Sequence, residues 1–273
     1  MLFFTIFFFN QMSLVTKAIN CANKALKSRT AFMLFLKDKE RTTKGSNYEC
    51  VFHYFDTSVY KRNNPYPKRK SDPLLPPYPE NIQVQHLLGG ADHYVFINLF
   101  MVELGHVVIS SANPLHKQGD DLNEKDCSAL SQVIRGFNRK GIAYYNSGWE
   151  SGCSQPHKHM QFAPLLNNPM FNLMKNKEKL PYKYYTVELG DDSPSHIYRA
   201  YKDLKNQANH NGSYNFIISN GSAVLVPRRK AYHPLGVNLN SLGVSGHFFL
   251  YEDSNPLILK KPLQILTDLC IKI

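Results

Sequence analysis

The feature that most constrains the fold is a pair of strand-like runs, GIAYYN (141–146) and HKHMQF (157–162), joined by the small-residue loop SGWESGCSQP. Successive side chains of a β-strand point to opposite faces, so His157, His159 and Gln161 are expected on one face. The residues between them then face the other way. We therefore expect a sheet that presents two imidazoles and one amide side by side, at the end of a bendable loop.

The other segments show strand and helix patterns without an internal repeat. Helical spacing of apolar residues predicts helices in 13–32, 122–140, 198–207 and 262–273, and strand patterns occupy 47–55, 91–100, 106–111, 213–219 and 222–229. In the second helix, Asn123 is expected to cap the first turn, with Asp126 three residues on. The proline-rich run 59–80 is expected to be a surface connection, because proline interrupts helix and sheet. This order of elements predicts an α+β fold with antiparallel neighbours.

Composition and charge narrow the class of protein. The 273 residues are 43% hydrophobic, which suits a real core, and the formal net charge of +11 favours anionic ligands such as nucleotides, nucleic acid or lipid. The basic cluster 68–70 is typical of a solvated loop, so a nucleic-acid partner is not expected. The apolar start, MLFFTIFFFN, is too short to span a bilayer. A translation start at Met12 explains residues 1–11 as well as a targeting role does. No membrane partner is expected.

The cysteines indicate the compartment. All five are scattered and none forms a Cys-x-x-Cys pair. They are expected to be free thiols in a reducing environment, which predicts a cytoplasmic or nuclear protein.

Three interpretations of the His157–Gln161 strand are open from the residues alone: metal ligands, a nucleophile with its supporting groups, or a solvated polar face. Glutamine is a poor metal ligand and no third ligand has matched spacing, so no metal site is expected. A solvated face leaves the loop unexplained. The small loop residues offer backbone N–H groups that can surround phosphate oxygens: Ser147, Gly148, Ser151, Gly152 and Ser154.

The chemistry favoured by this strand is nucleophilic attack on phosphorus. Neutral imidazole is nucleophilic at physiological pH, and its phosphoramidate can pass the group on. The Gln161 amide is placed to donate to a phosphate oxygen, while His157 and a backbone carbonyl are expected to orient the His159 ring.

The run YYNSGWESGCSQPHKHMQFAPL resembles the active-site segment of the diadenosine tetraphosphate (Ap4A) phosphorylases, or ATP adenylyltransferases, of the histidine triad and galactose-1-phosphate uridylyltransferase superfamily. The likeness extends from about Asn47 to the end, through SDPLLPPYPE, HYVFINLFMVELGHVVISS, LPYKYYTVEL, YNFIISNGSAVLVPRR and VNLNSLGVSGHFFL. It implies a histidine-triad-like antiparallel sheet with flanking helices, extended by N- and C-terminal segments. The implied units are an N-terminal extension 1–46, a catalytic domain 47–165, a connecting segment 166–212, and a C-terminal ATP adenylyltransferase domain 213–273 packed on the core.

The resemblance also implies residue roles. His159 is the nucleophile that carries the adenylyl group, and Gln161 contacts the transferred phosphate, with His157 in support. The implied substrate-binding residues are Lys61, Asn98, Asn146, Gly152, Cys153, Ser154, Gln155, Asn240, Ser241, Leu242, His247 and Tyr251. Leu99 and Tyr251 stand where a lysine is common in the family. Each missing cation should weaken polyphosphate binding by about 1.5 to 3 kcal/mol if the site is buried.

The implied reaction is phosphorolysis of Ap4A to ADP and ATP through a covalent His159-AMP intermediate. The expected ligands are a dinucleoside polyphosphate, ATP, ADP and phosphate, with no tightly bound cofactor and a divalent cation (Mg²⁺ or Mn²⁺) only as a companion of the polyphosphate. Two enzymatic alternatives are a related nucleotidyltransferase and a dinucleotide polyphosphate hydrolase. A non-catalytic nucleotide- or RNA-binding protein is the third, although it would have no use for an aligned nucleophile and amide.

Overall fold

The computed structural model describes the chain except for residues 1–11, 36–40, 45–47, 57–71 and 80, so Lys61 and the basic cluster 68–70 lie outside the described residues. Its largest element is an eight-stranded sheet in the order β10-β12-β11-β8-β9-β7-β5-β4, in which every neighbouring pair is antiparallel. The strands are β4 (Gln83–Leu87), β5 (His93–Ile97), β7 (Val107–Ser111), β8 (Ile142–Ser147), β9 (His159–Ala163), β10 (Tyr185–Glu188), β11 (Tyr214–Ser219) and β12 (Ser222–Pro227). The expected antiparallel α+β fold is confirmed.

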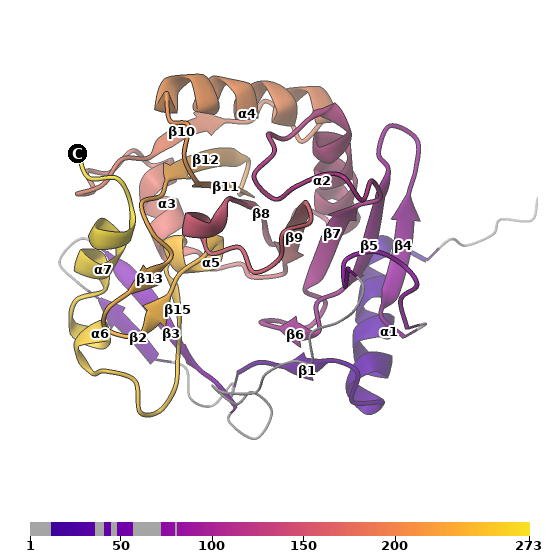
Figure 1. Ribbon diagram of the computed structural model, residues 1–273, viewed down its shortest axis with the longest axis horizontal. Coiled ribbons are helices and arrows are strands. Elements are labelled where there is room, and N and C mark those ends of the chain that lie inside the picture. Colours follow the sequence, from indigo (N-terminus) through magenta and orange to yellow (C-terminus); the bar gives the residue numbers. More distant parts are fainter. Residues whose placement is uncertain (1–11, 36–40, 45–47, 57–71, 80) are drawn as a thin grey trace, which may run out of the picture.

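Three helices cover one face of this sheet: α1 (Leu14–Lys27), α2 (Glu124–Gly136) and α4 (Pro194–Ala208). Each begins where its sequence supplies a side-chain cap. Asn123 and Asp126 form a full capping box on α2, whereas Ser13 and Ser193 cap the other two. Their apolar sides form one core with alternate residues of the strands. These helices lie along the upper and right-hand sides of Figure 1.

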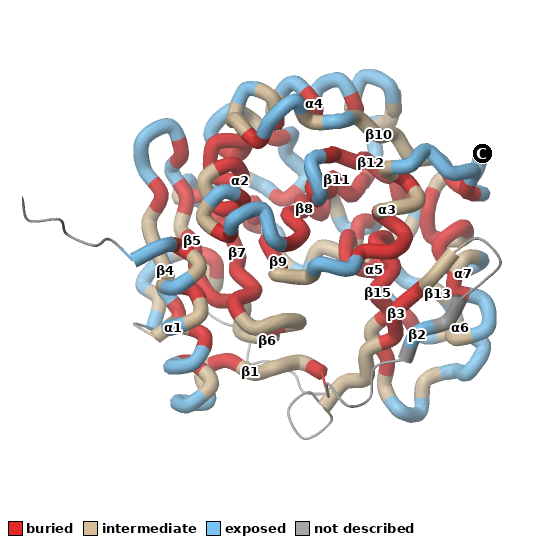
Figure 2. The backbone as a smooth tube through the Cα atoms, turned by 180° about the vertical axis from the view of Figure 1, so that it is seen from behind, coloured by how far each residue is buried: buried red, intermediate tan, exposed pale blue. Residues whose placement is uncertain are grey.

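The opposite face carries a second core and a smaller sheet. This sheet contains β2 (Arg41–Lys44), β3 (Glu49–Tyr54) and β15 (His247–Leu250), with β15 parallel to β3. It packs together with α3 (Pro169–Lys175), α5 (Ser241–Val244), α6 (Leu257–Lys260) and α7 (Pro262–Leu269). Figure 2 shows that buried residues concentrate in the central strands, in α2 and α5, and in β15. The large sheet is therefore sandwiched between helices and a mixed layer.

Short elements complete the described chain: β1 (Phe32–Met33) parallel to β6 (Phe100–Met101), β13 (Tyr232–His233) antiparallel to β14 (Val237–Asn238), and a single 3-10 turn, η2 (Trp149–Ser151). The large sheet takes strands from segments on both sides of residues 166–212. That segment itself contains α3, β10 and α4.

One detail of the strand prediction is wrong. His157 was expected inside the strand, but β9 begins at His159, and His157 forms an isolated bridge with Lys117. The neighbouring strand β8 pairs with β9 only as far as Tyr144 and Gln161. The two strands diverge there, which interrupts the ladder before it reaches His157.

Two expectations about the environment can be compared with the described residues. All five cysteines are described and are free thiols. No helix in the described part of the chain combines the length and apolar character needed to cross a bilayer.

Candidate active site

The candidate site forms where β8 and β9 diverge. Tyr144 and Gln161 are paired across the two strands, so the residues two positions further toward the loop, Asn146 and His159, share their face. This is the face that carries α5 and the smaller sheet, because Tyr144 belongs to the second core. Residues on the other face, including Met160, pack under α1 and α2. The period of two predicted from the sequence thus places the polar groups together.

His159 is held in one tautomer. Its side chain is buried, and Nδ1 lies 2.8 Å from the carbonyl oxygen of His157. Because a carbonyl can only accept, Nδ1 carries the proton and Nε2 keeps its lone pair. Burial lowers the pKa of His159 from its ordinary value of 6.5 to about 4. The ring is therefore neutral at physiological pH, with one nucleophilic nitrogen.

The His157 ring is turned away from His159. Its Nδ1 lies 2.8 Å from Asp72 Oδ2, and its Nε2 lies 2.8 Å from the carbonyl oxygen of Ser111. Both partners are hydrogen-bond acceptors that hold the ring from two sides. The side chain of His157 thus fixes the chain before β9, while its backbone carbonyl orients the His159 ring.

Gln161 is fixed by three donors that converge on Oε1. His106 Nε2 lies 2.9 Å away, the Tyr144 hydroxyl 3.0 Å and Asn98 Nδ2 3.2 Å. Burial lowers the pKa of His106 to about 4, so it is neutral, and its Nδ1 accepts from the Val102 N–H. This leaves a proton on His106 Nε2 to donate. With Oε1 engaged, the Gln161 amino group is the part of the side chain left to bind a substrate.

Asn146 is arranged in the same way. Its Oδ1 accepts from Asn215 Nδ2 at 2.8 Å, from the Ser241 N–H at 3.0 Å and from the Ser241 hydroxyl at 2.6 Å. Asn215 in turn accepts at 2.6 Å from the fully buried guanidinium of Arg228. The amino group of Asn146 therefore remains for a ligand. Ser241, a predicted substrate residue from the C-terminal segment, contacts β8 through these two bonds.

The loop after β8 makes two tight approaches that glycine permits. Gly148 and Gly152 have φ of +75° and +84°, a region that side chains disfavour. A Cβ on Gly152 would lie 2.6 Å from the carbonyl oxygen of Leu239 and 2.9 Å from Asn240 Cα. The Gly152 N–H, expected to face a phosphate oxygen, instead donates to the Trp149 carbonyl at 3.0 Å. The role that the structure gives Gly152 is close packing against the C-terminal segment, beside Asn240.

The remaining predicted substrate residues lie in three places: the loop after β8, the start of α5, and β15 with the residues that follow it. Cys153 and Gln155 are partly buried and Ser154 is exposed in the loop, while Leu242 belongs to the second core. The carbonyl oxygen of Asn240 and its side chain both serve α5, whose first turn the side chain caps. His247 and Tyr251 lie in or just after β15, in the smaller sheet, and not in the sheet that carries His159. His247 is buried, with Nδ1 2.9 Å from His53 Nε2.

Four residues of the site were not identified from the sequence as such: Asp72, Gln118, Tyr144 and Asn215. Each acts through a partner that is distant in the chain or on a neighbouring strand, as with Asp72 and His157. His106, directly after Gly105, also supports the site, through its hydrogen bond to Gln161. A weak signal did exist, since Asp72 lies in the SDPLLPPYPE segment that carries part of the resemblance.

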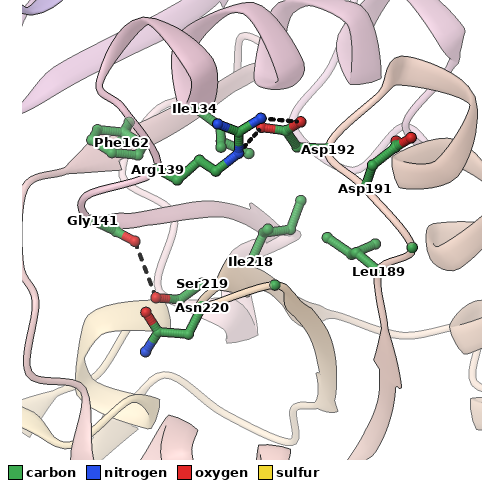
Figure 3. Close-up of a pocket in the computed structure, with 12 residues that line it drawn as sticks. Ile134, Arg139, Gly141, Phe162, Leu189, Asp191, Asp192, Ile218, Ser219 and Asn220 are labelled. Carbon is green, nitrogen blue, oxygen red and sulfur yellow. Dashed lines mark hydrogen bonds and ion pairs between the residues drawn. The ribbon is translucent and has the colours of Figure 1, made fainter.

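A cavity of about 290 Å³ lies at the other end of the same strands (Figure 3). It is lined by Gly141 and Phe162, at the ends of β8 and β9 remote from His159, and by residues next to α4. Arg139 and Asp192 form an ion pair at its rim, with 2.8 Å between Nε and Oδ2. The cavity is thus separate from the histidines.

Comparison with known proteins gives the family. The model of the Ap4A phosphorylase N-terminal domain matches residues 51–184, and that of the ATP adenylyltransferase C-terminal domain matches residues 178–272. Diadenosine 5',5'''-P1,P4-tetraphosphate phosphorylase 2 of Saccharomyces cerevisiae is 24% identical over 268 residues, covering 82% of this chain and 81% of the relative.

The solved structures of yeast Ap4A phosphorylase Apa2 have a similar fold. The structure without a named ligand has a TM-score of 0.77 at 17% identity and covers 96% of this chain and 98% of its own. The Ap4A complex has a TM-score of 0.74 at 19% identity, covering 93% and 95%, and the AMP complex 0.77 at 20%, covering 95% and 97%. With both domain models matched in succession, the chain belongs to the Ap4A phosphorylase (ATP adenylyltransferase) family and is a nucleotidyltransferase.

Proposed function

We propose that the protein cleaves Ap4A by phosphorolysis, giving ADP and ATP through a covalent adenylyl-His159 intermediate. The observation that carries this proposal is the hydrogen bond from His159 Nδ1 to the His157 carbonyl. It leaves Nε2 unprotonated in a ring that burial keeps neutral. The family membership and the yeast relative's name support Ap4A as the substrate.

In the first step His159 Nε2 attacks the phosphorus next to one adenosine. The N–P bond forms, the bond to the bridging oxygen breaks, and ATP leaves with the electron pair of that bond. Positive charge then develops on the ring and is stabilised through Nδ1–H and the His157 carbonyl. The amino groups of Gln161 and Asn146 are the donors for the non-bridging oxygens, because both carbonyl oxygens are already engaged.

In the second step inorganic phosphate attacks the adenylyl phosphorus, the N–P bond breaks and ADP is released. His159 returns to its neutral state with the lone pair on Nε2. Splitting the transfer in this way needs an intermediate that survives until phosphate arrives. Water in place of phosphate would make the enzyme a hydrolase that produces AMP and ATP.

A divalent cation and the cellular compartment belong to the same proposal. The described residues include no cluster of three or more His, Cys, Asp or Glu side chains arranged for a metal. A Mg²⁺ or Mn²⁺ ion that accompanies the substrate would accordingly be coordinated by phosphate oxygens. Five free thiols are consistent with action in the cytoplasm or nucleus.

The test is incubation with Ap4A in the presence and absence of phosphate, followed by identification of the products. We expect ADP and ATP, a rate that saturates with phosphate, and ping-pong initial rates. Without phosphate, acid-labile adenylyl label should remain on the wild-type protein and be missing from His159→Ala. Formation of AMP and ATP at the same rate without phosphate would show a hydrolase. More than about 1% of wild-type turnover in His159→Ala would refute the nucleophile.

A further inference from the structure

The side chain of Gln118 bonds to both backbone polar groups of His159, the N–H and the carbonyl. This side chain is buried, and Oε1 accepts from the His159 N–H at 2.7 Å. Its Nε2 donates at 2.9 Å to the His159 carbonyl and at 2.9 Å to the Asn146 carbonyl. Both the oxygen and the amino group of this amide are therefore hydrogen-bonded to the two strands. The backbone of His159 is held at its N–H and at its carbonyl.

The backbone of Gln118 ties the two ends of the loop between β8 and β9. Its N–H donates at 2.8 Å to the Pro156 carbonyl, near the end of the loop. Its carbonyl accepts from Gly148 N–H at 3.3 Å, near the start, and from the Tyr145 hydroxyl at 2.6 Å. One residue thus connects both sides of the loop mouth.

This arrangement replaces a rung of the sheet. The β8–β9 ladder ends at Tyr144 and Gln161, and the next residues on that face are Asn146 and His159. Neighbouring strands of a ladder lie about 4.8 Å apart and bond directly. Here the amide of Gln118 stands between the two backbones and bonds to each. It satisfies backbone groups that would otherwise be buried without partners, and it keeps the strands separated at the nucleophile.

We propose that Gln118 is a positioning residue for adenylyl transfer. It sets the position and orientation of the His159 ring, and so of Nε2, without touching the substrate. The His159 ring is fixed relative to the His157 carbonyl, so its aim depends on where this short stretch of backbone lies. Gln118 fixes that backbone from the β8 side. Since attack requires alignment to within an ångström or so, loss of this contact should slow the chemical step by about 100-fold. The proposal rests on the proposed function.

The test is single-turnover adenylyl transfer at saturating Ap4A without phosphate, comparing wild type, Gln118→Met and Gln118→Glu. Methionine has similar length and removes all three side-chain hydrogen bonds. Glutamate keeps the acceptor for the His159 N–H, but it can donate to only one of the two carbonyls, and only when it is protonated. We expect about a 100-fold slower transfer in Gln118→Met, with KM within about threefold. The rate of Gln118→Glu relative to wild type should rise as pH falls from 8 to 5.5, which the methionine variant should not show.

The matched control is Ser219→Ala. Ser219 is buried and its hydroxyl donates at 3.0 Å to the carbonyl of Gly141, at the other end of β8. This variant loses a buried hydrogen bond at that end but should keep its rate within about twofold. Amide hydrogen exchange at His159 should accelerate in Gln118→Met and not in the control. That measurement needs no turnover.

Several results would overturn the proposal. Transfer within threefold of wild type in Gln118→Met, or in Gln118→Glu at pH 8 if the methionine variant does not fold, would remove the positioning role. Equal rate losses in Gln118→Met and Ser219→Ala would assign Gln118 to stability alone. Failure of the proposed function is distinguishable, because wild type would then form no adenylyl-protein while the exchange difference at His159 would persist.

Discussion

Acidification should destabilise the folded protein in part through His159. Burial holds the pKa of this side chain at about 4, compared with 6.5 in an unfolded chain. Between these values the unfolded state binds a proton that the folded state does not. The contribution of His159 to stability is therefore fully present above pH 6.5 and is lost as the pH falls toward 4. Below the folded pKa this group causes no further loss.

The size of the effect follows from the two pKa values. Linkage gives a loss of about 2 kcal/mol of unfolding free energy for His159 alone between pH 7 and pH 5. His106 has the same lowered pKa, also about 4 because of burial, and should contribute a similar loss. Each contribution is a large fraction of a typical total stability of roughly 5–15 kcal/mol.

The assay is urea unfolding of wild type and His159→Asn at pH 7 and pH 5. Asparagine retains an N–H that can donate to the His157 carbonyl, but it does not titrate. The fall in unfolding free energy between the two pH values should be smaller in the variant by about 2 kcal/mol. His106→Asn should behave in the same way and provides an independent check.

The refuting result is a fall that is the same in wild type and His159→Asn within about 0.5 kcal/mol. It would mean that His159 binds its proton equally in the folded and unfolded states. The argument for an unprotonated Nε2 ready to attack phosphorus would then fail, whatever the products of the reaction.

Three further predictions concern the groups around His159. Gln161→Glu should lower the single-turnover rate by about 100- to 1000-fold, because a donor to the phosphate is replaced by a carboxylate, and a near-normal rate would contradict its assigned orientation. Gly152→Ala should lose at least about 1 kcal/mol in thermal unfolding as well as activity, since its φ and its distance to Leu239 exclude a Cβ, and unchanged stability would contradict this. Asp72→Asn should slow transfer by about tenfold by weakening the charge-assisted bond to His157, which the same single-turnover assay measures.

The parts of the fold that the sequence predicted are those that local physics decides. The capping box at Asn123 and Asp126 needs only residues three apart, and it starts α2 where expected. Alternation along β9 placed His159 and Gln161 on one face because the period of a strand is set by its own backbone. The alternation could not show that the ladder ends at Tyr144, since that depends on a third segment entering between the strands.

The supporting groups of the site escaped prediction because their contacts join distant segments. Asp72 meets His157 across 85 positions, and Ser241 meets Asn146 across 95. Gln118 looks like an ordinary polar loop residue in the sequence, and only the path of the chain gives its side chain three buried hydrogen bonds, to His159 and Asn146. The resemblance supplied Asn146 and Ser241 as separate substrate residues but gave no indication that they bond to each other.

The net charge of +11 was a poor guide to how the described site handles an anion. Lys158, between His157 and His159, is buried on the opposite face and forms an ion pair with Asp126, with Nζ 2.6 Å from Oδ2. At the two positions where the family often has lysine, Leu99 packs against the first core and the ring of Tyr251 lies against Phe55.

In the proposed mechanism, the described residues present neutral amides to the phosphate group, on Gln161 and Asn146, each fixed by three donors to its carbonyl oxygen. Fixed dipoles in a buried site do not need to reorganise when charge develops on the transferred phosphate, and salt screens them little. Flexible surface cations would concentrate a polyanion near the protein, but they would not discriminate between its ground state and its transition state. A site built from oriented amides around a neutral imidazole therefore favours the chemical step more than it favours simple retention of the substrate.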